Sequence, residues 1–432
     1  MTSNKPEGRN GWFWVPSLYY AEGIPYVIVM TVSVIMYKRL GISNTDIALY
    51  TSWLYLPWVI KPLWSPIVDI FKKKRNWIIV MQLIVGAGLA GVALTIPVSN
   101  FFQYTLAFLW LVAFSSATHD IAADGFYMLG LSQHDQAFFV GIRSVFYRLA
   151  MITGQGLLVI LAGFFENSFG DISLAWSVTF VILAGLFILF FVYHKFILPY
   201  PKTDVSSRKD ESSSIFNEFI KTFVAFFKKK NIGLILGFIL LYRLGEAQLV
   251  KIASPFLLDG REVGGIGLTT SEIGFVYGTV GVLCLLLGGI IGGIVVAKQG
   301  LKFWIWPMII SINLPDLVYV FLAYVQPTSL VIISVMVAIE QLGYGFGFTA
   351  YMLYLIYVSE GEYKTSHYAL ATGFMALGMM IPGMWSGWLQ ELIGYQHFFI
   401  WVCIATIPGF IITYFLKIDP EFGKKKDKPV EA

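Results

Sequence analysis

The sequence predicts an all-α polytopic membrane protein whose twelve membrane-spanning helices form two bundles of six. Three observations support this fold class. Of the 432 residues, 57% are hydrophobic and only 13% are charged, and the mean hydropathy is +0.71, unlike the composition of soluble domains. The apolar residues gather in runs of roughly 20 residues, the length at which a helix crosses a bilayer. A polar connection separates these runs into two groups of six.

The apolar runs give the expected positions of the helices. The first group predicts helices at 12–37, 45–66, 76–97, 102–129, 136–163 and 172–197, and the second at 231–257, 270–297, 303–325, 329–358, 364–391 and 396–417. No small-residue cleavage site follows the first run, so we interpret it as a spanning helix and not a signal peptide. The chain is thus expected to contain an N-terminal six-helix bundle (1–198), a cytoplasmic linker with an amphipathic helix (199–230), a C-terminal six-helix bundle (231–418) and a cytoplasmic tail (419–432).

Basic residues indicate how the chain lies in the membrane. With a cytoplasmic amino terminus, 22 Lys and Arg residues fall on the cytoplasmic side, whereas only Lys38, Arg39 and Arg261 fall on the opposite side. Cytoplasmic loops of membrane proteins carry an excess of Lys and Arg. The bias therefore predicts that both termini lie in the cytoplasm.

Two short motifs occur once in each half of the chain. Leu18–Gly23 (LYYAEG) returns loosely as Leu241–Glu246 (LYRLGE), and Gly41–Ile47 (GISNTDI) returns as Gly267–Ile273 (GLTTSEI). A parallel repeat of six plus six helices, joined by a long cytoplasmic connection, is the layout of the major facilitator fold. We therefore expect that fold.

Glycine and proline residues predict where helices approach closely or bend. The pairs Gly288 with Gly292 and Gly289 with Gly293 are typical of a close helix crossing in a membrane. Prolines in the first and ninth helices, Pro25 and Pro315, should loosen the backbone beside two acidic residues, Glu22 and Asp316.

The stretch from Thr118 to Leu129 (THDIAADGFYML) places two carboxylates inside an apolar run. Asp120 and Asp124 are four residues apart, so they share one helix face. A charged side chain at the centre of a membrane helix costs about 2.5 to 3.5 kcal/mol on insertion scales, so this face should meet protein or water and not lipid. We expect it to line a transport pathway; the alternative is that the aspartates cap the cytoplasmic end of the helix or tie it to a neighbour.

Eleven Asp, Glu, Lys and Arg residues lie in the interior of the predicted spans, away from the span ends: Glu22, Lys61, Asp120, Asp124, Arg143, Arg148, Arg243, Glu246, Lys251, Asp316 and Glu340. They should face a shared interior, where structural ion pairs and functional pairs are equally compatible with the sequence. Carboxylates in a dry cavity can take up and release protons near neutral pH, which makes Asp120, Asp124 and Glu22 candidates for proton coupling. Arginine stays charged and grips anions, so Arg148 is the candidate whose charge the proton state modulates.

Other polar side chains near these charges are candidates for substrate binding. Tyrosine and amide side chains can hydrogen-bond to, or stack on, a sugar or peptide, although each of them alone also fits ordinary helix packing. The full set of predicted substrate-binding residues is Arg148, Lys61, Tyr19, Tyr20, Gln155, Arg243, Glu246, Asp316, Glu340 and Gln341.

Several function classes have no support in the sequence. There is no GxxxxGK[ST] loop for nucleotide hydrolysis, no nucleophile elbow and no metal-ligand spacing among the five histidines. Cys284 and Cys403 each lie in an apolar run, so we interpret them as buried thiols. His119 is interpreted as a packing or hydrogen-bonding residue. We therefore expect no enzyme activity, cofactor, metal or nucleic-acid partner.

Four segments resemble the muropeptide permease (AmpG) and acetyl-coenzyme A transporter family of the major facilitator superfamily: Glu22–Pro25 (EGIP), Lys61–Asp69 (KPLWSPIVD), His119–Phe126 (HDIAADGF) and Phe146–Gly156 (FYRLAMITGQG). In that family the fourth helix typically reads QDI, two variable residues, D, a small residue and an aromatic. His119 stands where glutamine is usual. The resemblance implies that the functional residues include Glu22, Lys61, Asp120, Asp124 and Arg148.

The resemblance implies proton-driven import of an anionic cell-wall fragment, N-acetylglucosaminyl anhydro-muramyl sugar with or without its peptide, from periplasm to cytoplasm. It also implies a multi-pass protein of the bacterial inner membrane, and we expect a monomer. One alternative is transport of another organic anion, such as an acyl-coenzyme A or a siderophore-like compound. A second alternative is a membrane enzyme or sensor that transports nothing.

Overall fold

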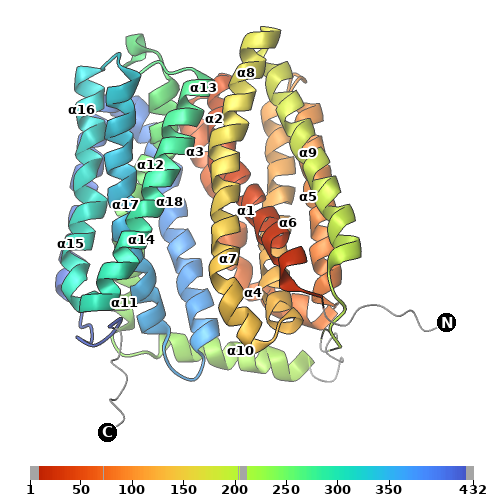
Figure 1. Ribbon diagram of the computed structural model, residues 1–432. Coiled ribbons are helices and arrows are strands. Elements are labelled where there is room, and N and C mark those ends of the chain that lie inside the picture. Colours follow the sequence, from red (N-terminus) through yellow and green to blue (C-terminus); the bar gives the residue numbers. More distant parts are fainter. Residues whose placement is uncertain (1–8, 72, 203, 205–211, 425–432) are drawn as a thin grey trace. The chain divides into compact units, whose positions relative to one another are not determined.

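The computed structural model describes residues 9–71, 73–202, 204 and 212–424 (Figure 1). Within these residues every regular element is a helix, which confirms the predicted all-α class. The chain divides into two compact units. Unit 1 comprises Met1–Lys221 and Thr269–Gly278, and unit 2 comprises Thr222–Leu268 and Thr279–Ala432.

Unit 1 contains the six spans predicted for the first half of the chain. Its helices are α1 (Val15–Val27), α2 (Ser33–Arg39), α3 (Asn44–Trp53), α4 (Leu56–Phe71), α5 (Lys74–Thr95), α6 (Phe101–Gly130), α7 (Gln133–Ile152), α8 (Val159–Phe169) and α9 (Ile172–Ile197). A short turn between α3 and α4 divides the predicted span 45–66. The short α13 (Thr270–Ile273) also belongs to this unit. In Figure 1, α5 lies beside α6 and α9.

Unit 2 contains the spans of the second half. Its helices are α11 (Ile232–Leu241), α12 (Leu244–Leu258), α14 (Val282–Gln299), α15 (Leu301–Asn313), α16 (Leu317–Val325), α17 (Leu330–Ser359), α18 (Lys364–Ala405) and α19 (Ile407–Tyr414). A further helix, α10 (Ser212–Phe227), lies in the expected linker. The last two predicted spans meet without a loop, because only Gly394 (φ 76°, ψ 164°) leaves the helical conformation within α18.

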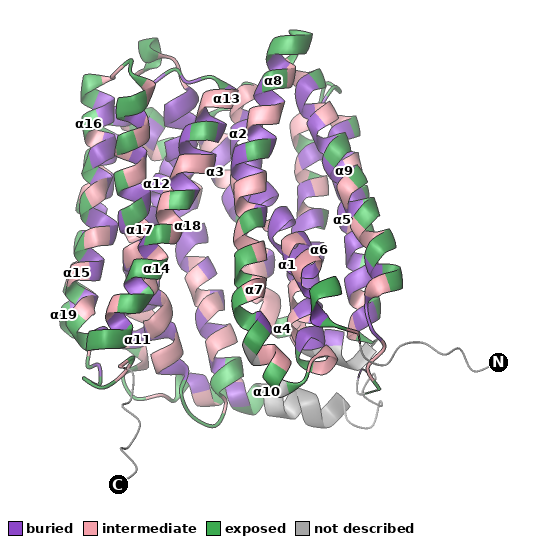
Figure 2. Cartoon of the chain, viewed as in Figure 1, coloured by how far each residue is buried: buried purple, intermediate pink, exposed green. Residues whose placement is uncertain are grey.

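Among the described residues, ten helices are long and apolar enough to cross a membrane. One of these, Lys364–Tyr414, contains the last two predicted spans. Many large apolar side chains remain exposed, as Leu189 and Phe196 of α9 illustrate at 66% and 71%, and green stretches mark this helix in Figure 2. Exposed apolar surface on this scale marks a protein that lies in lipid.

Glycines set the distance between α14 and α17. A Cβ atom on Gly288 would lie 2.1 Å from the carbonyl oxygen of Leu342, and one on Gly345 would lie 1.9 Å from that of Leu285. Both distances are far below van der Waals contact, so only glycine fits. Gly292 also faces α17, which confirms the predicted crossing for the Gly288 and Gly292 pair, whereas a Cβ on Gly293 would meet nothing within 4 Å.

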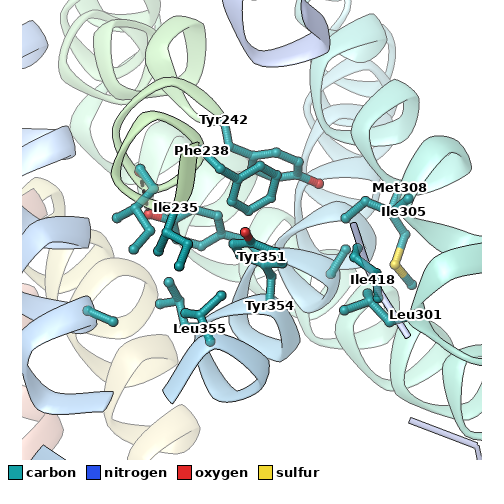
Figure 3. Packing of buried hydrophobic residues seen from close by; sticks show 14 of the residues in the cluster. Ile235, Phe238, Tyr242, Leu301, Ile305, Met308, Tyr351, Tyr354, Leu355 and Ile418 are labelled. Atoms are coloured by element: carbon teal, nitrogen blue, oxygen red, sulfur yellow. Dashed lines mark hydrogen bonds between the residues drawn. The ribbon is translucent and has the colours of Figure 1, made fainter. Parts of the chain in front are cut away.

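Aromatic side chains fill the core of unit 2 (Figure 3). The rings of Tyr242 and Tyr351 stack at a centroid distance of 5.3 Å, and Phe238 packs against Tyr354 at 4.3 Å. The two buried tyrosine hydroxyls donate to backbone carbonyls. Tyr242 donates to Gly347 at 3.0 Å, and Tyr351 donates to Ile239 of α11 at 2.7 Å. These bonds satisfy the hydroxyls, so the aromatic core carries little polar cost.

Helix irregularities occur next to the buried charges. Pro25 in α1 is followed by a π-helical segment, η2 (Ile28–Val32), and Pro315 lies in a 3-10 turn, η7 (Leu314–Asp316), that separates α15 from α16. Arg243 leaves the helical conformation (φ −114°, ψ 23°) and separates α11 from α12. The loosened backbone expected at both prolines is therefore present.

Glu166 at the end of α8 holds three elements of unit 1 together. Its carboxylate pairs with Arg39 at 2.9 Å and accepts hydrogen bonds from Trp176 at 2.9 Å and from Thr270 at 2.6 Å. Thr270 belongs to the segment Thr269–Gly278, which we expected to lie with the second half but which groups with unit 1. Thr270 binds this carboxylate and the hydroxyl of Ser271 donates to the carbonyl of Ile160 at 3.3 Å, so two side chains join that segment to α8.

We predict that Gly345→Ala lowers the stability of the protein because α14 and α17 must separate to admit the methyl group. Overpacking of this kind costs about 1 to 3 kcal/mol. The measurement is thermal unfolding of the purified protein in detergent. Gly293→Ala is the matched control, because it adds the same methyl group where no atom lies within 4 Å. Equal melting temperatures for the two variants would contradict the close crossing.

Candidate functional site

A lysine and an aspartate meet inside unit 1. The Nζ atom of Lys61 on α4 lies 3.5 Å from Oδ2 of Asp120 on α6. The indole nitrogen of Trp58, three residues before Lys61, donates to the same oxygen at 3.1 Å. The Asp120 side chain is 15% exposed and that of Lys61 30%. Asp120 is therefore a partly buried anion that is held by two donors from α4.

The second aspartate of the predicted motif has a different partner. Arg143 on α7 donates through Nη1 to Oδ1 of Asp124 at 3.0 Å and to the hydroxyl of Tyr19 at 2.8 Å. The Tyr19 hydroxyl donates in turn to Oδ1 of Asp124 at 3.1 Å. The guanidinium carbon lies 4.8 Å from the ring centroid of Tyr19 and 5.0 Å from that of Tyr127. Hydrogen bonds and ring contacts together fix the orientation of Arg143.

The sequence pointed to Arg148 as the arginine whose charge the carboxylates modulate. In the structure the arginine that pairs with Asp124 is Arg143. Arg148 is half-buried and has no hydrogen bond or ion pair with any described residue. The two arginines are five residues apart on α7, which rotates their side chains by about 140° relative to each other on an α-helix. Only one of them can face α1 and α6.

Glu22 lies at the centre of these groups. Its side chain is buried, and its Oε2 atom has no hydrogen-bond partner among the described residues. The charges of Asp124, Asp120, Lys61 and Arg143 all act on it. An ionised carboxylate without a donor is costly to bury, so Glu22 is stable in this position when it is protonated or when a cation approaches it.

The ligand atoms of Glu22, His119 and Asp120 lie within 4.8 Å of one another, a spacing that can hold a metal ion. We did not expect a metal here. Asp120 already accepts from Trp58 and lies beside the ammonium group of Lys61, which supplies positive charge at this point. The three residues can therefore hold a proton, or lie beside the ammonium group of Lys61, as well as they could bind a metal ion.

Sequence reasoning missed a buried chain of polar side chains that supports His119. Gln82 on α5 bonds with its Nε2 atom to Nε2 of His119 at 3.0 Å and with its Oε1 atom to Nδ1 of His194 at 2.9 Å. His194 on α9 then bonds to the hydroxyl of Ser17 at 2.9 Å. This confirms His119 as a hydrogen-bonding residue. Only its position next to Asp120 could have drawn attention to the chain, because Gln82 and His194 lie in distant apolar runs.

The predicted residues of the second half gather within unit 2. Arg243 donates to the hydroxyl of Tyr344, and its guanidinium carbon lies 5.2 Å, 4.8 Å and 5.9 Å from the ring centroids of Tyr344, Phe348 and Tyr351. Aromatic rings stabilise a cation through their negative faces. Arg243 therefore remains charged in a nearly dry position, at 7% exposure.

Three acidic side chains lie in the same unit: Glu246 at the start of α12, Asp316 in η7 and Glu340 in α17. They are 0%, 1% and 2% exposed. Both oxygens of Glu246 and both oxygens of Asp316 have no hydrogen-bond partner among the described residues. Glu340 accepts from Gln341 at 2.9 Å.

Two predicted residues lie outside both clusters. The hydroxyl of Tyr20 donates to Thr153 at 2.9 Å, and the side chain lines an apolar cavity of about 420 Å³ with aromatic neighbours such as Phe146 and Phe190. Gln155 is buried in the π-helical segment η3 (Thr153–Leu158). Neither contacts the carboxylates through a hydrogen bond within the described residues.

The geometry suits ion-coupled movement of a solute better than bond chemistry. Carboxylates that are paired with cations, or buried without donors, can exchange protons, and lysine and arginine can hold an anion. The profile of the Major Facilitator Superfamily matches residues 19–381. The chain belongs to this superfamily. It is thus a multi-pass membrane transporter and not an enzyme.

Within the superfamily the chain is similar to AmpG permeases. It is 28% identical over 412 residues to a putative transporter AmpG 4 of Rickettsia conorii, which covers 91% of this chain and 94% of the relative. It is 25% identical over 422 residues to the anhydromuropeptide permease of Escherichia coli K12, covering 95% of this chain and 80% of the relative.

Solved structures show the same fold. The nucleoside transporter NupG superposes with a TM-score of 0.70 at 15% identity, covering 95% of this chain and 100% of that one. A bacterial homologue of the human lysosomal transporter Spinster, in an inward-facing and unoccupied conformation, superposes with a TM-score of 0.66 at 16% identity, covering 93% and 95%. These similarities confirm the predicted major facilitator fold.

We predict that Gln82→Ala destabilises the transporter, because it leaves two buried histidines each without one hydrogen bond. Unsatisfied buried groups cost about 1 to 3 kcal/mol each. Thermal unfolding in detergent measures the effect. Gln103→Ala on α6 is the control, since Gln103 is exposed. A Gln82→Ala variant as stable as the control would show that the polar chain contributes nothing to folding.

Proposed function

We propose that this permease is a proton symporter that imports an anionic muropeptide, N-acetylglucosaminyl anhydro-muramyl sugar with or without its peptide, from periplasm to cytoplasm. The observation that carries the substrate class is the similarity to the anhydromuropeptide permease of Escherichia coli over 95% of this chain. The motifs of α1, α4 and α6 that suggested the family also supply Glu22, Lys61, Asp120 and Asp124 of this site, whereas Arg143 on α7 lies outside them.

The arrangement in unit 1 supports the proton part of this proposal. Asp120 and Asp124 each pair with one cation. Glu22 lies between these pairs, and its Oε2 atom accepts no hydrogen bond from a described residue. A proton on Asp120 removes the attraction for Lys61, and a proton on Asp124 removes that for Arg143. Glu22, Asp120 and Asp124 are therefore the proposed proton-coupling residues.

The same pairs support coupling to an anion. A lysine or arginine released by a protonated carboxylate becomes available for the carboxylate of the substrate, so the two anions compete for one cation. Proton uptake then favours substrate binding, and deprotonation expels the substrate. Lys61 takes this role in unit 1. Arg148 adds a cation that has no hydrogen bond or ion pair with a described residue. The sugar is offered donors and rings by Tyr19, Tyr20, Gln155, Arg243 and Gln341.

We place the protein as a monomer in the bacterial inner membrane with both termini in the cytoplasm. The two bundles are assigned to residues 1–198 and 231–418, the linker to 199–230 and the tail to 419–432. The excess of Lys and Arg on one side supports the orientation. A reporter that is active only in the cytoplasm, fused after Ala432, should show activity in cells. An inactive fusion that is nevertheless made and inserted would reverse the orientation.

Uptake into proteoliposomes tests the function. With an inside-alkaline pH gradient, purified protein should accumulate labelled anhydro-muropeptide at least tenfold above protein-free liposomes, and a protonophore should abolish the accumulation. Unlabelled acyl-coenzyme A should not compete. Accumulation that is the same with and without the pH gradient would overturn the symport mechanism. Competition by acyl-coenzyme A would overturn the substrate class.

Variants of the carboxylates test the coupling residues. Asp120→Asn and Asp124→Asn should lower gradient-driven uptake at least tenfold but retain exchange of labelled for unlabelled substrate, because exchange requires binding without net proton transfer. Glu262→Gln is the control, since this glutamate is exposed outside both clusters. Undiminished pH dependence in both variants would remove the two aspartates from the mechanism.

The double variant Lys61→Ala with Asp120→Asn separates a functional pair from a structural one. If the pair only stabilises the fold, neutralising both members should restore the uptake that each single variant loses, because neither charge is then left unpaired. We expect no restoration, because the double variant lacks both the proton carrier and the cation. Recovery to the parent rate would identify a structural pair.

A further inference from the structure

We propose that Glu246, Asp316 and Glu340 form a second proton-binding site, contained in unit 2, that carries its own proton in each transport cycle. This inference rests on the proposed proton symport and reassigns three residues that sequence reasoning placed with the substrate. It implies that transport of one substrate molecule moves one more proton than the carboxylates of unit 1 account for.

The carboxylates of Glu246 and Asp316 are buried without hydrogen-bond partners among the described residues. Glu246 and Asp316 are 0% and 1% exposed, and none of their four carboxylate oxygens accepts a hydrogen bond from a described residue. An ionised carboxylate needs several donors to offset its loss of water, whereas the protonated form has no charge to desolvate. These positions thus accommodate carboxylic acids much better than carboxylates.

The three acids repel one another when they are ionised. The charges of Glu246 and Glu340 both act on Asp316, and that of Glu246 acts on Glu340. Interacting carboxylates in one dry site release their protons one at a time, since each ionisation makes the next more costly. A group of three acids can therefore hold a proton that is lost when the site meets water of lower acidity.

The other titratable groups of unit 2 around the acids are an arginine, a lysine, tyrosines and a cysteine. Arg243 is the cation that acts on Glu246, but its guanidinium already donates to Tyr344 and lies over three rings. The acids also face Tyr319 from α16, which acts on Glu340, and Cys403 from α18, which interacts with Asp316. Lys251 on α12 and Tyr351 on α17 are further buried titratable groups of unit 2. Tyrosine and cysteine bring no positive charge, whereas Lys251 is a second buried basic residue of the unit.

A proton suits the site better than an anionic substrate or a metal ion. The acids offer an anionic muropeptide no positive charge, and any of them that ionises would repel it. A bound metal ion requires ligand atoms that converge on one point. Among the described residues, the group whose ligand atoms do so is Glu22 with His119 and Asp120, not the triad of unit 2. A proton is the cation that needs no such convergence.

Accumulation at equilibrium tests the proposal. At a pH gradient of one unit and zero membrane potential, each coupled proton multiplies the accumulation ratio about tenfold. We expect about hundredfold accumulation by the parent protein and about tenfold by Asp316→Asn and by Glu246→Gln, with substrate exchange within about twofold of the parent. The control Glu360→Gln, an exposed residue of the same unit, should match the parent. Parental ratios in both variants would overturn the proposal.

A second measurement does not depend on the substrate. If the acids are protonated in the folded protein, folding binds protons at this site, so stability falls as the pH rises. We expect Glu246→Gln with Asp316→Asn to melt within a few degrees of the parent at pH 6 and to lose less stability than the parent at pH 9. Equal loss in both proteins, or a collapse of the variant already at pH 6, would show that the acids are ionised and paired.

The two sets of results separate the inference from the function on which it rests. If the parent accumulates no muropeptide under a pH gradient, the proposed function fails, and the melting curves still test the triad. If the parent accumulates it but the triad variants keep the parental ratio, only the second proton site fails. Accumulation driven by a Na⁺ gradient in the parent, and lost in the variants, would replace the proton by Na⁺.

Discussion

The structure depends on one constraint: a membrane offers no water to the ionisable groups that transport requires. Each such group has to find its partners within the protein. In unit 1 this constraint produces pairs that link helices, with Lys61 and Asp120 joining α4 to α6 and Arg143 and Asp124 joining α7 to α6. In unit 2 it is met differently, because Arg243 lies over aromatic rings while Glu246 and Asp316 have no hydrogen-bond donor among the described residues.

The difference between the two units has a physical consequence for their roles. Paired charges can be separated and re-formed, which fits the proposed exchange between a proton and a solute anion in unit 1. Glu246 and Asp316 have no hydrogen-bond partner among the described residues, which fits the proposed proton site in unit 2. The helix interruptions at Arg243 and at Pro315 place Glu246 and Asp316 near helix ends, whereas Glu340 lies within α17.

Composition and the length of apolar runs were enough to predict the spans, because a bilayer imposes the same requirement on every helix that crosses it. The types of residue in the site were also predictable, since charged residues in apolar runs stand out. Their pairings were not. Arg143 and Arg148 look alike in the sequence, and the choice between them depends on which face of α7 meets α1. Gln82 and His194 lie in distant runs, and only the packing of α5 against α6 and α9 brings them to His119.

Gly394 joins the last two spans within α18 without a loop. Its φ of 76° is a conformation that only glycine adopts freely, so one residue reverses the course of the chain where other spans use several. An epitope or a cleavage sequence inserted at this junction would disrupt the two helices that it joins. A side chain at this position would strain the backbone on both sides. Engineering of this carrier should therefore leave the final hairpin intact and place tags in the longer connections.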